Sequence, residues 1–324
     1  MPLVRHSTYS PPPLFRNPHV QTVHPALFRR VSGVDFQRER IPTPDGDFLD
    51  LDWSSKGFSR LGILCHGLEG SSTRPYMKGM ARALDRHGWD ALAWSYRGCS
   101  GEPNGKPRFY HSGATEDLET VVRHALSTGR YGKVALIGFS LGGNLVLKYL
   151  GDAGEALPSE IQAAVAFSVP CDLASGAREM AKARNRLYMD RFLKMLREKI
   201  RAKMELFPGS LHDEGFERIR DFKQFDDRYT APLHGFRSAE DYWRKASCRR
   251  VLPAVRVPAL LVNAQDDPFL GEACYPRVEA EESDRLFLEI PQHGGHAGFV
   301  AFGDGGLYWS ERRAMAFLAE ALGE

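Results

Sequence analysis

The sequence has few cysteines, and no two of them have the spacing of a metal-binding or redox pair. Five cysteines are scattered through 324 residues, an odd number without a C-x-x-C motif. This pattern argues against a disulfide framework and a zinc site, and it is typical of reduced thiols in the cytoplasm. We therefore expect a cytoplasmic protein without a metal, and we predict no cofactor.

Long apolar runs and a strong net charge are also missing. No stretch of about 18 uninterrupted apolar residues occurs, so no transmembrane helix is expected. Residues 1–13 hold no apolar run that resembles a signal peptide. The 43 basic and 41 acidic residues leave a formal charge of +2, whereas a nucleic-acid-binding protein needs a strongly basic face. We expect a soluble protein that does not bind nucleic acid.

Strands and helices alternate along most of the sequence. Residues 36–41 and 48–53 flank a Pro/Asp/Gly turn and predict a β-hairpin. Further apolar segments have the length of strands, and amphipathic segments between them have the period of helices. The strands are 61–65, 89–96, 134–137, 161–169, 258–263 and 285–290, and the helices include 74–87 and 114–127. This alternation predicts a mostly parallel sheet covered by helices on both faces.

The alternation stops between about residues 170 and 250. No clear strand occurs there, and residues 178–207 form one long helical pattern. Such an insertion would lie over the carboxyl ends of the strands, where the active sites of open α/β sheets form. We predict a core domain built from residues 1–169 and 251–324, with residues 170–250 as a helical cap insertion.

A serine stands between a predicted strand and a predicted helix, with glycines around it. Residues 138–142 read Gly-Phe-Ser-Leu-Gly, so the serine is Ser140. A serine on a sharp strand-to-helix turn has a strained backbone that requires small neighbours, and the turn exposes its hydroxyl at the end of a sheet. The pattern predicts a nucleophile elbow, but a G-x-S-x-G motif also arises by chance, so its partners must support it.

Candidate partners follow Ser140 in the chain order acid, then histidine. A serine hydroxyl becomes a good nucleophile when a histidine takes its proton and a carboxylate orients that histidine. Asp266 and Asp267 follow one predicted strand, and His293 and His296 follow the next. We prefer Asp267 because it lies on the turn just beyond the strand, and His296 because two glycines precede it. The other member of each pair then serves as a turn residue.

Two backbone N–H groups are candidates for an oxyanion hole. One belongs to Leu141, the residue after the nucleophile. The other belongs to Leu68 in the glycine-containing loop 66–70, which follows a predicted strand and reads His-Gly-Leu-Glu-Gly. Glycines let such a loop approach the substrate closely. We expect His66 to brace this loop rather than to take part in catalysis.

Seven short motifs spread over nearly the whole chain resemble those of the YheT-like α/β-hydrolases, the bacterial relatives of animal α/β-hydrolase-domain proteins 1, 2 and 3. They are residues 16–22 (RNPHVQT), 66–70 (HGLEG), 96–101 (YRGCSG), 138–144 (GFSLGGN), 225–230 (FDDRYT), 263–269 (NAQDDPF) and 293–299 (HGGHAGF). The resemblance implies an α/β-hydrolase fold and hydrolysis of carboxylic esters by a triad of Ser140, Asp267 and His296. Because the animal relatives act on glycerolipids or phospholipids, a small ester or lipid-like substrate is implied. Residues 16–22 have no role that the sequence explains.

The leading hypothesis is a carboxylesterase-type serine hydrolase that forms an acyl-enzyme on Ser140. An acyltransferase, a lipase or a thioesterase would use the same triad, and a non-catalytic binding protein could keep the same fold. The sequence does not decide the acyl chain length, the leaving group or the oligomeric state.

The predicted cap carries a basic amphipathic segment. Residues 178–205 hold ten Lys/Arg and four Asp/Glu. An apolar stripe has helical spacing and consists of Met189, Leu193, Leu196, Ile200, Met204 and Phe207. One interpretation is a helix that contacts a membrane surface or guides anionic acyl substrates. The other, which we favour, is a cap helix whose stripe packs on the core or on a dimer partner.

Two charged residues outside the triad also call for an interpretation. Arg97 follows a predicted strand, and we expect it to shape the loop beside the site. Asp117 lies on the predicted helix 114–127 and is expected to be a solvated or capping carboxylate. His111 and Asp117 are separated by five residues, one more than the His-x4-Asp acyltransferase motif requires.

Overall fold

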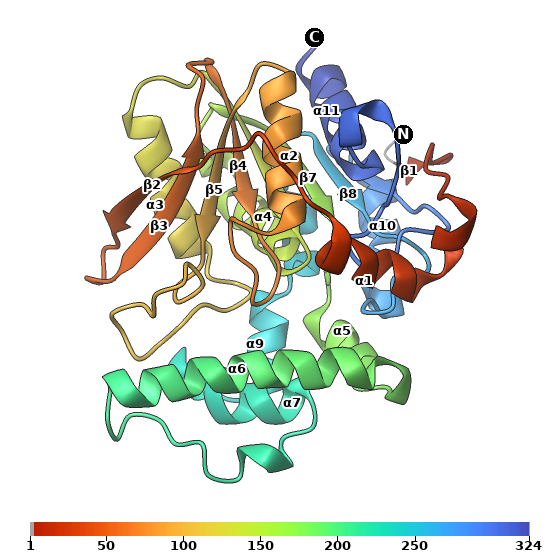
Figure 1. Ribbon diagram of the computed structural model, residues 1–324. Coiled ribbons are helices and arrows are strands. Elements are labelled where there is room, and N and C mark those ends of the chain that lie inside the picture. The colour runs from red at the N-terminus through yellow and green to blue at the C-terminus, as the bar shows by residue number, and fades with distance from the viewer. Residues whose placement is uncertain (1–2, 324) are drawn as a thin grey trace.

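A single sheet forms the centre of the protein. The structure is a computed structural model that describes residues 3–323, and within them the strands follow the order β1-β9-β8-β7-β6-β4-β5-β3-β2 (Figure 1). β3 runs antiparallel to β2 and β5, and every other neighbouring pair is parallel. The strands are β1 (Leu3–Val4), β2 (Gln37–Pro42), β3 (Phe48–Ser54), β4 (Arg60–Cys65), β5 (Asp90–Ser95), β6 (Lys133–Phe139), β7 (Ile161–Phe167), β8 (Ala259–Val262) and β9 (Leu286–Glu289). The predicted mostly parallel sheet is confirmed.

Helices cover both faces of this sheet. Successive strand residues point to opposite faces, so Leu136 packs with α3 and α4 while Ile137 packs with α2 and α11. The covering helices are α2 (Pro75–Arg86), α3 (Thr115–Ser127), α4 (Leu141–Ala153), α10 (Arg277–Glu281) and α11 (Trp309–Leu322). Because both faces are buried, the central strands are apolar throughout, as the sequence pattern indicated.

Three elements near the termini were not predicted. β1 has two residues, too few for an alternating pattern, and it pairs in parallel with β9. α1 (Pro18–Phe28) begins with two ordinary signals, since the Asn17 side chain caps it and Pro18 occupies its first turn. The third is α11, which packs on the sheet near the C-terminus (Figure 1). The Asn-Pro pair could have predicted α1 from sequence.

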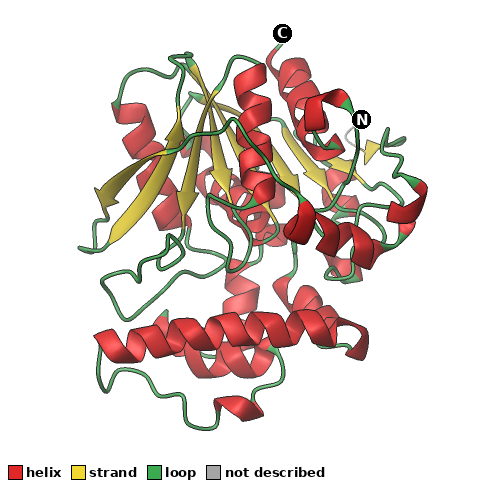
Figure 2. Ribbon diagram, viewed as in Figure 1, coloured by secondary structure: helices red, strands yellow, loops and turns green. Residues whose placement is uncertain are grey.

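The segment between β7 and β8 contains helices and loops, and no strand is assigned among its residues (Figure 2). Its helices are α5 (Leu173–Met180), α6 (Arg186–Leu206), α7 (Phe222–Phe225), α8 (Ala231–Leu233) and α9 (Ala239–Ala246), with a π-helical turn at Asp226–Thr230. α6 extends across the carboxyl ends of the central strands (Figure 1). The boundaries 170 and 250 for a cap insertion stay a prediction.

The helical pattern 178–207 is interrupted, which corrects the expectation of one long helix. α5 ends at Met180 and α6 begins at Arg186. Between them, Asn185 is buried, and its side chain donates hydrogen bonds to the carbonyls of Glu179 and Pro268 at 3.0 and 2.6 Å. This amide fixes the turn between the two helices and joins it to the loop after β8.

The apolar stripe of α6 faces inward. Met189, Leu193, Leu196 and Ile200 are buried and pack with apolar residues of the segment that follows α6, including Phe216 and Phe225. The favoured interpretation placed this stripe on the core or on a dimer partner, whereas it packs mainly on the segment after α6, with Phe109 and Phe269 contributing from the core. Contact of α6 with a membrane stays a prediction. No helix in the described part of the chain is long and apolar enough to cross a membrane.

Asp117 is buried, so the expectation of a solvated or capping carboxylate was wrong. It lies in α3 and pairs with Arg97, whose side chain is only 2 % exposed, at an N–O distance of 2.6 Å. Arg97 also contacts Asp45 and Asp47 in the β2–β3 turn at 3.0 and 2.8 Å. One guanidinium therefore ties the hairpin turn and α3 to the end of β5, as expected of a residue that shapes this loop.

We expect Arg97→Met to lower the free energy of unfolding by about 3–5 kcal/mol, because it leaves buried carboxylates without their cation. The exposed ion pair of Arg123 with Glu119 supplies the control. Arg123→Met should cost less than about 1 kcal/mol. Urea unfolding curves measure both, and equal losses in the two variants would contradict the structural role given to Arg97.

Candidate active site

Ser140 has an unusual backbone conformation, with φ 54° and ψ −120°. It lies where β6 ends and α4 begins, and few residues other than glycine adopt a positive φ. A Cβ on Gly142 would lie 2.3 Å from the carbonyl oxygen of Cys65, and one on Gly138 would lie 2.3 Å from that of Gly142. Glycine is therefore required on both sides of Ser140, because position 142 packs against the end of β4 and position 138 packs against the start of α4.

The structure brings the three predicted triad side chains together. His296 Nε2 lies 2.8 Å from Ser140 Oγ. His296 Nδ1 lies 2.9 Å from Asp267 Oδ2 and 3.1 Å from Oδ1. The Asp267 side chain is fully buried and also accepts the backbone N–H of Phe269 at 2.9 Å. The phenyl ring of Phe269 lies 4.2 Å from the imidazole of His296, between centroids, and covers it.

This geometry determines how the protons are arranged. A carboxylate can only accept hydrogen bonds, so the neutral His296 ring carries its hydrogen on Nδ1, toward Asp267. Nε2 is then free to accept the hydroxyl proton of Ser140. The arrangement can therefore activate a serine hydroxyl as a nucleophile.

The alternative acid and histidine form a separate pair. His293 Nδ1 lies 3.1 Å from Asp266 Oδ2, and Asp266 Oδ1 accepts the backbone N–H of Gly295 at 2.9 Å. Burial raises the pKa of Asp266 above its ordinary value. Asp266 thus holds the turn that leads to His296, which agrees with the expected role of a turn residue.

The N-terminal segment 16–22, unexplained by the sequence, packs against the histidine loop. Thr22 Oγ accepts the backbone N–H of His296 at 2.9 Å, and the buried Gln21 accepts that of Val300 at 3.0 Å. A Cβ on Gly298 would lie 2.4 Å from the carbonyl oxygen of Gln21. Sequence reasoning missed these residues because their partners lie more than 270 positions away.

The two predicted oxyanion donors have no acceptor within the described chain. Gly67 N–H donates to the hydroxyl of Tyr76 at 3.0 Å, and Glu69 N–H donates to that of Tyr110 at 2.8 Å. Leu68 N–H lies between these two occupied groups, and no protein acceptor is recorded for it or for Leu141 N–H in residues 3–323. The loop approaches the elbow closely, since a Cβ on Gly67 would lie 3.2 Å from that of Ser140.

His66 braces the same loop, as expected. Its ring contacts the carbonyl oxygen of Gly67 at 2.7 Å through Nδ1, and its Nε2 accepts the backbone N–H of Tyr96 at 3.1 Å. Burial lowers the pKa of His66 to about 3, so the ring is neutral at ordinary pH. Both ring nitrogens are therefore occupied within the fold.

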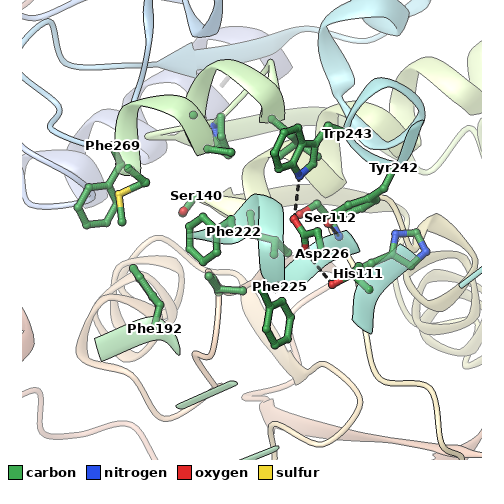
Figure 3. A pocket seen from close by; sticks show the side chains of 18 of the residues that line it. His111, Ser112, Ser140, Phe192, Phe222, Phe225, Asp226, Tyr242, Trp243 and Phe269 are labelled. Atoms are coloured by element: carbon green, nitrogen blue, oxygen red, sulfur yellow. Dashed lines mark hydrogen bonds between the residues drawn. The ribbon is translucent and has the colours of Figure 1, made fainter. Parts of the chain in front are cut away.

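Two pockets meet at Ser140 and His296. The cap pocket encloses about 130 Å³ and is lined mostly by apolar side chains. Figure 3 shows Phe192, Phe222, Phe225 and Phe269 around it, with Ser140 at one side. The α1 pocket encloses about 190 Å³ and also reaches Ser140 and His296, and Val23, Tyr76, Tyr188 and Met195 contribute to its walls.

One carboxyl group, that of Asp226, interrupts the apolar wall of the cap pocket. It belongs to the π-helical turn and accepts hydrogen bonds from Thr230 Oγ at 2.6 Å and Trp243 Nε1 at 2.8 Å (Figure 3). Burial raises the pKa of Asp226 to about 7, although both hydrogen bonds act in the opposite direction. Asp226 belongs to the motif 225–230, whose sequence alone does not predict that it lines a pocket.

Comparisons with known proteins place this arrangement in context. A family model described as alpha/beta hydrolase fold matches residues 63–301. YheT of Escherichia coli (strain K12), whose name describes a proposed esterase, is 36 % identical over 293 residues, which cover 88 % of this chain and 85 % of YheT. Phospholipase ABHD3 of Mus musculus is 30 % identical over 277 residues, or 82 % of this chain and 67 % of that protein.

Solved structures with low sequence identity share the fold. Esterase Pf2001 of Pyrococcus furiosus superimposes with a TM-score of 0.62 at 16 % identity, covering 91 % of this chain and 97 % of that one. Est1E of Butyrivibrio proteoclasticus, solved with ferulic acid, gives a TM-score of 0.57 at 17 % identity and covers 88 % and 100 %.

The buried carboxyl of Asp226 predicts a pH-dependent stability. In the unfolded chain this group loses its proton near its ordinary pKa of 3.8, whereas the folded chain holds it until about pH 7. Its contribution to the free energy of unfolding is therefore complete below about pH 4 and is lost as the pH rises to 7. Asp226→Asn does not titrate, so its melting temperature should rise relative to wild type between pH 5 and 7 and then level off.

Thermal melts at half-unit pH steps measure this difference. Asp190→Asn removes an exposed carboxylate of α6 and serves as the control, with a difference from wild type that stays flat over the same range. A flat difference for Asp226→Asn as well would contradict the raised pKa.

Proposed function

This chain belongs to the α/β-hydrolase fold family and is a relative of YheT and ABHD3, and from that premise we propose that it is a serine hydrolase that cleaves carboxylic esters. The observation that carries the proposal is the hydrogen-bonded series Asp267, His296 and Ser140, beside two backbone N–H groups that have no acceptor among residues 3–323. Ester hydrolysis through an activated serine uses this combination, and a binding protein does not need it.

In the first half of the proposed reaction, Ser140 Oγ attacks the ester carbonyl carbon while His296 Nε2 takes the hydroxyl proton. Asp267 stabilises the imidazolium that forms and keeps its Nδ1–H directed inward. The carbonyl oxygen becomes negatively charged, and the N–H groups of Leu68 and Leu141 are aimed to bind it. His296 then gives its proton to the leaving alcohol, and an acyl group remains on Ser140.

In the second half, water takes the place of the alcohol. His296 removes a proton from the water, whose oxygen attacks the acyl carbon, and the same two N–H groups bind the second oxyanion. Collapse of this intermediate returns the proton to Ser140 Oγ and releases the acid. No cofactor or metal enters this scheme.

The two pockets supply room for the two arms of an ester. The carbonyl carbon of a bound ester must lie beside Ser140 Oγ, so the acyl arm and the alcohol arm extend in different directions from it. The cap pocket suits an apolar arm, because phenyl side chains form much of its wall. The α1 pocket supplies room for the other arm, and Arg74 and Glu69 are among the residues that line it.

Ser140→Ala should abolish ester hydrolysis while the protein stays folded. We expect the rate of p-nitrophenyl butyrate cleavage to fall by at least about 1,000-fold, because the nucleophile is lost while the oxyanion donors remain. A fluorophosphonate probe should label the wild-type protein and leave Ser140→Ala unlabelled. Activity of the variant near that of wild type would overturn the proposal.

The two neighbouring histidines offer a matched comparison. His296→Ala should reduce kcat by at least about 1,000-fold, because the proton acceptor for Ser140 is lost. His293→Ala should stay within about fivefold of wild type, because that ring faces Asp266 instead of Ser140. Steady-state kinetics distinguish the two variants. Similar losses of kcat in both would contradict the assignment of His296 as the general base.

The substrate class requires a panel, since the relatives' names include both an esterase and a phospholipase. Short and long p-nitrophenyl esters, monoacylglycerols, glycerophospholipids and acyl thioesters should be compared, with Ser140→Ala as the blank. Product formation that depends on an added alcohol acceptor would instead favour an acyltransferase on the same triad.

A further inference from the structure

The oxyanion loop 66–70 is held from the cap as well as from the core. Glu69 is the residue after Leu68, and its φ of 50° is in the left-handed region that a glutamate rarely adopts. Such a conformation persists only where surrounding contacts hold it. The contacts on Glu69 therefore help to hold the loop that carries the neighbouring Leu68 N–H.

Core residues hold the backbone of Glu69. Its N–H donates to the Tyr110 hydroxyl at 2.8 Å, and Arg74 donates to its carbonyl oxygen at 2.9 Å. The Tyr110 hydroxyl donates in turn to Glu69 Oε1 at 2.8 Å. The side chain of Glu69 is therefore folded back over its own peptide, where a cation from the segment between β7 and β8 reaches it.

That cation is Lys199 of α6. Its Nζ lies 3.3 Å from Glu69 Oε1, donates to the carbonyl oxygen of Gly98 at 2.7 Å and lies 3.3 Å from Cys99 Sγ. The side chains of Lys199 and Glu69 are 8 % and 9 % exposed, so water screens this pair poorly. Burial favours the neutral amine, yet the neighbouring Cys99 and Glu69 raise the pKa of Lys199 above its ordinary value.

A second buried lysine on α6 offers a matched comparison for Lys199. Lys203 lies one turn further along α6 and is completely buried. Its Nζ donates to the carbonyl oxygens of Asn104 and Lys106, both at 2.6 Å. Lys203 thus fastens the same helix to the core through a loop that is not the oxyanion loop.

We propose that Lys199 is a positioning residue through which the cap helix α6 orients the Leu68 N–H toward the oxyanion, by its ion pair with Glu69. The proposal rests on the proposed function, since it assumes that Leu68 binds an oxyanion. Without the charge of Lys199, the Glu69 carboxylate is drawn toward water and the strained peptide relaxes. A displaced donor loses most of its effect in the transition state, where the oxygen is charged, and little in the ground state.

The test compares Lys199→Met with Lys203→Met in p-nitrophenyl butyrate hydrolysis. Both changes remove a buried cation from α6, so both are expected to lower the melting temperature. Lys199→Met should reduce kcat by about tenfold or more with KM within about twofold, because one misaligned oxyanion donor weakens only the transition state. Lys203→Met should keep kcat within about twofold of wild type.

Three further measurements keep the test decisive. A trifluoromethyl ketone forms a tetrahedral oxyanion on the serine, so its inhibition constant should rise in Lys199→Met by the factor that kcat falls. Glu69→Gln keeps the acceptor for Tyr110 and removes the charge, and it should reproduce the loss of kcat. The double variant Lys199→Met/Glu69→Gln should be no slower than the slower single variant, because both changes break one contact. If Lys199→Met does not fold, the kcat of Glu69→Gln alone decides whether the ion pair has a positioning role.

Equal kcat values for Lys199→Met and Lys203→Met, or a normal kcat for Glu69→Gln, would overturn the positioning role. Failure of the proposed function has a different signature, in which wild type and Ser140→Ala hydrolyse the ester at the same rate. A loss of kcat in Lys199→Met without a matching rise in the inhibition constant would also contradict an effect on the oxyanion.

Discussion

The positive φ of Ser140 is the constraint on which the rest of the site depends. It lifts the hydroxyl out of the turn between β6 and α4. This turn forms because glycines at 138 and 142 let β6, the end of β4 and the start of α4 approach one another at backbone distance. Every partner must then reach a point fixed by the sheet. The parallel strands make this possible, because the loops after β4, β8 and β9 all leave the sheet at the carboxyl ends of their strands.

The loops around Ser140 are each held by segments distant in sequence. Thr22 and Gln21 near the N-terminus hold the histidine loop, and Asn185 between α5 and α6 holds the acid loop at Pro268. Tyr76 and Tyr110 hold the oxyanion loop, to which Lys199 adds a charge from α6. The segment between β7 and β8 therefore contacts both the loop after β8 and the loop 66–70. Under the proposed function, a change in its position would reach the triad through hydrogen bonds as well as through the pocket wall.

The features that could be predicted from sequence are those that depend on the local spacing of residues. Strand length, helical period and the glycines around Ser140 were enough to predict the sheet and the elbow, and the order of Asp267 and His296 along the chain was enough to predict that they meet it. Asp117 was misjudged because its partner, Arg97, comes from another loop. The contacts of Thr22, Asn185 and Lys199 could not be predicted either, since they join segments whose relative placement depends on the whole fold. The Asn17–Pro18 pair is a local helix-start signal from which α1 could have been predicted.

The central claim is that an acyl group passes through Ser140, and its most direct test is to catch that group on the protein. Wild-type protein mixed with excess p-nitrophenyl ester and quenched in acid should carry one acyl group per chain, located by mass spectrometry on the peptide that contains Ser140. The release of p-nitrophenol should show a burst of the same stoichiometry whenever deacylation is the slower step. An acyl group mapped to another residue, with Ser140 unmodified at every quench time while the ester is being cleaved, would contradict the account.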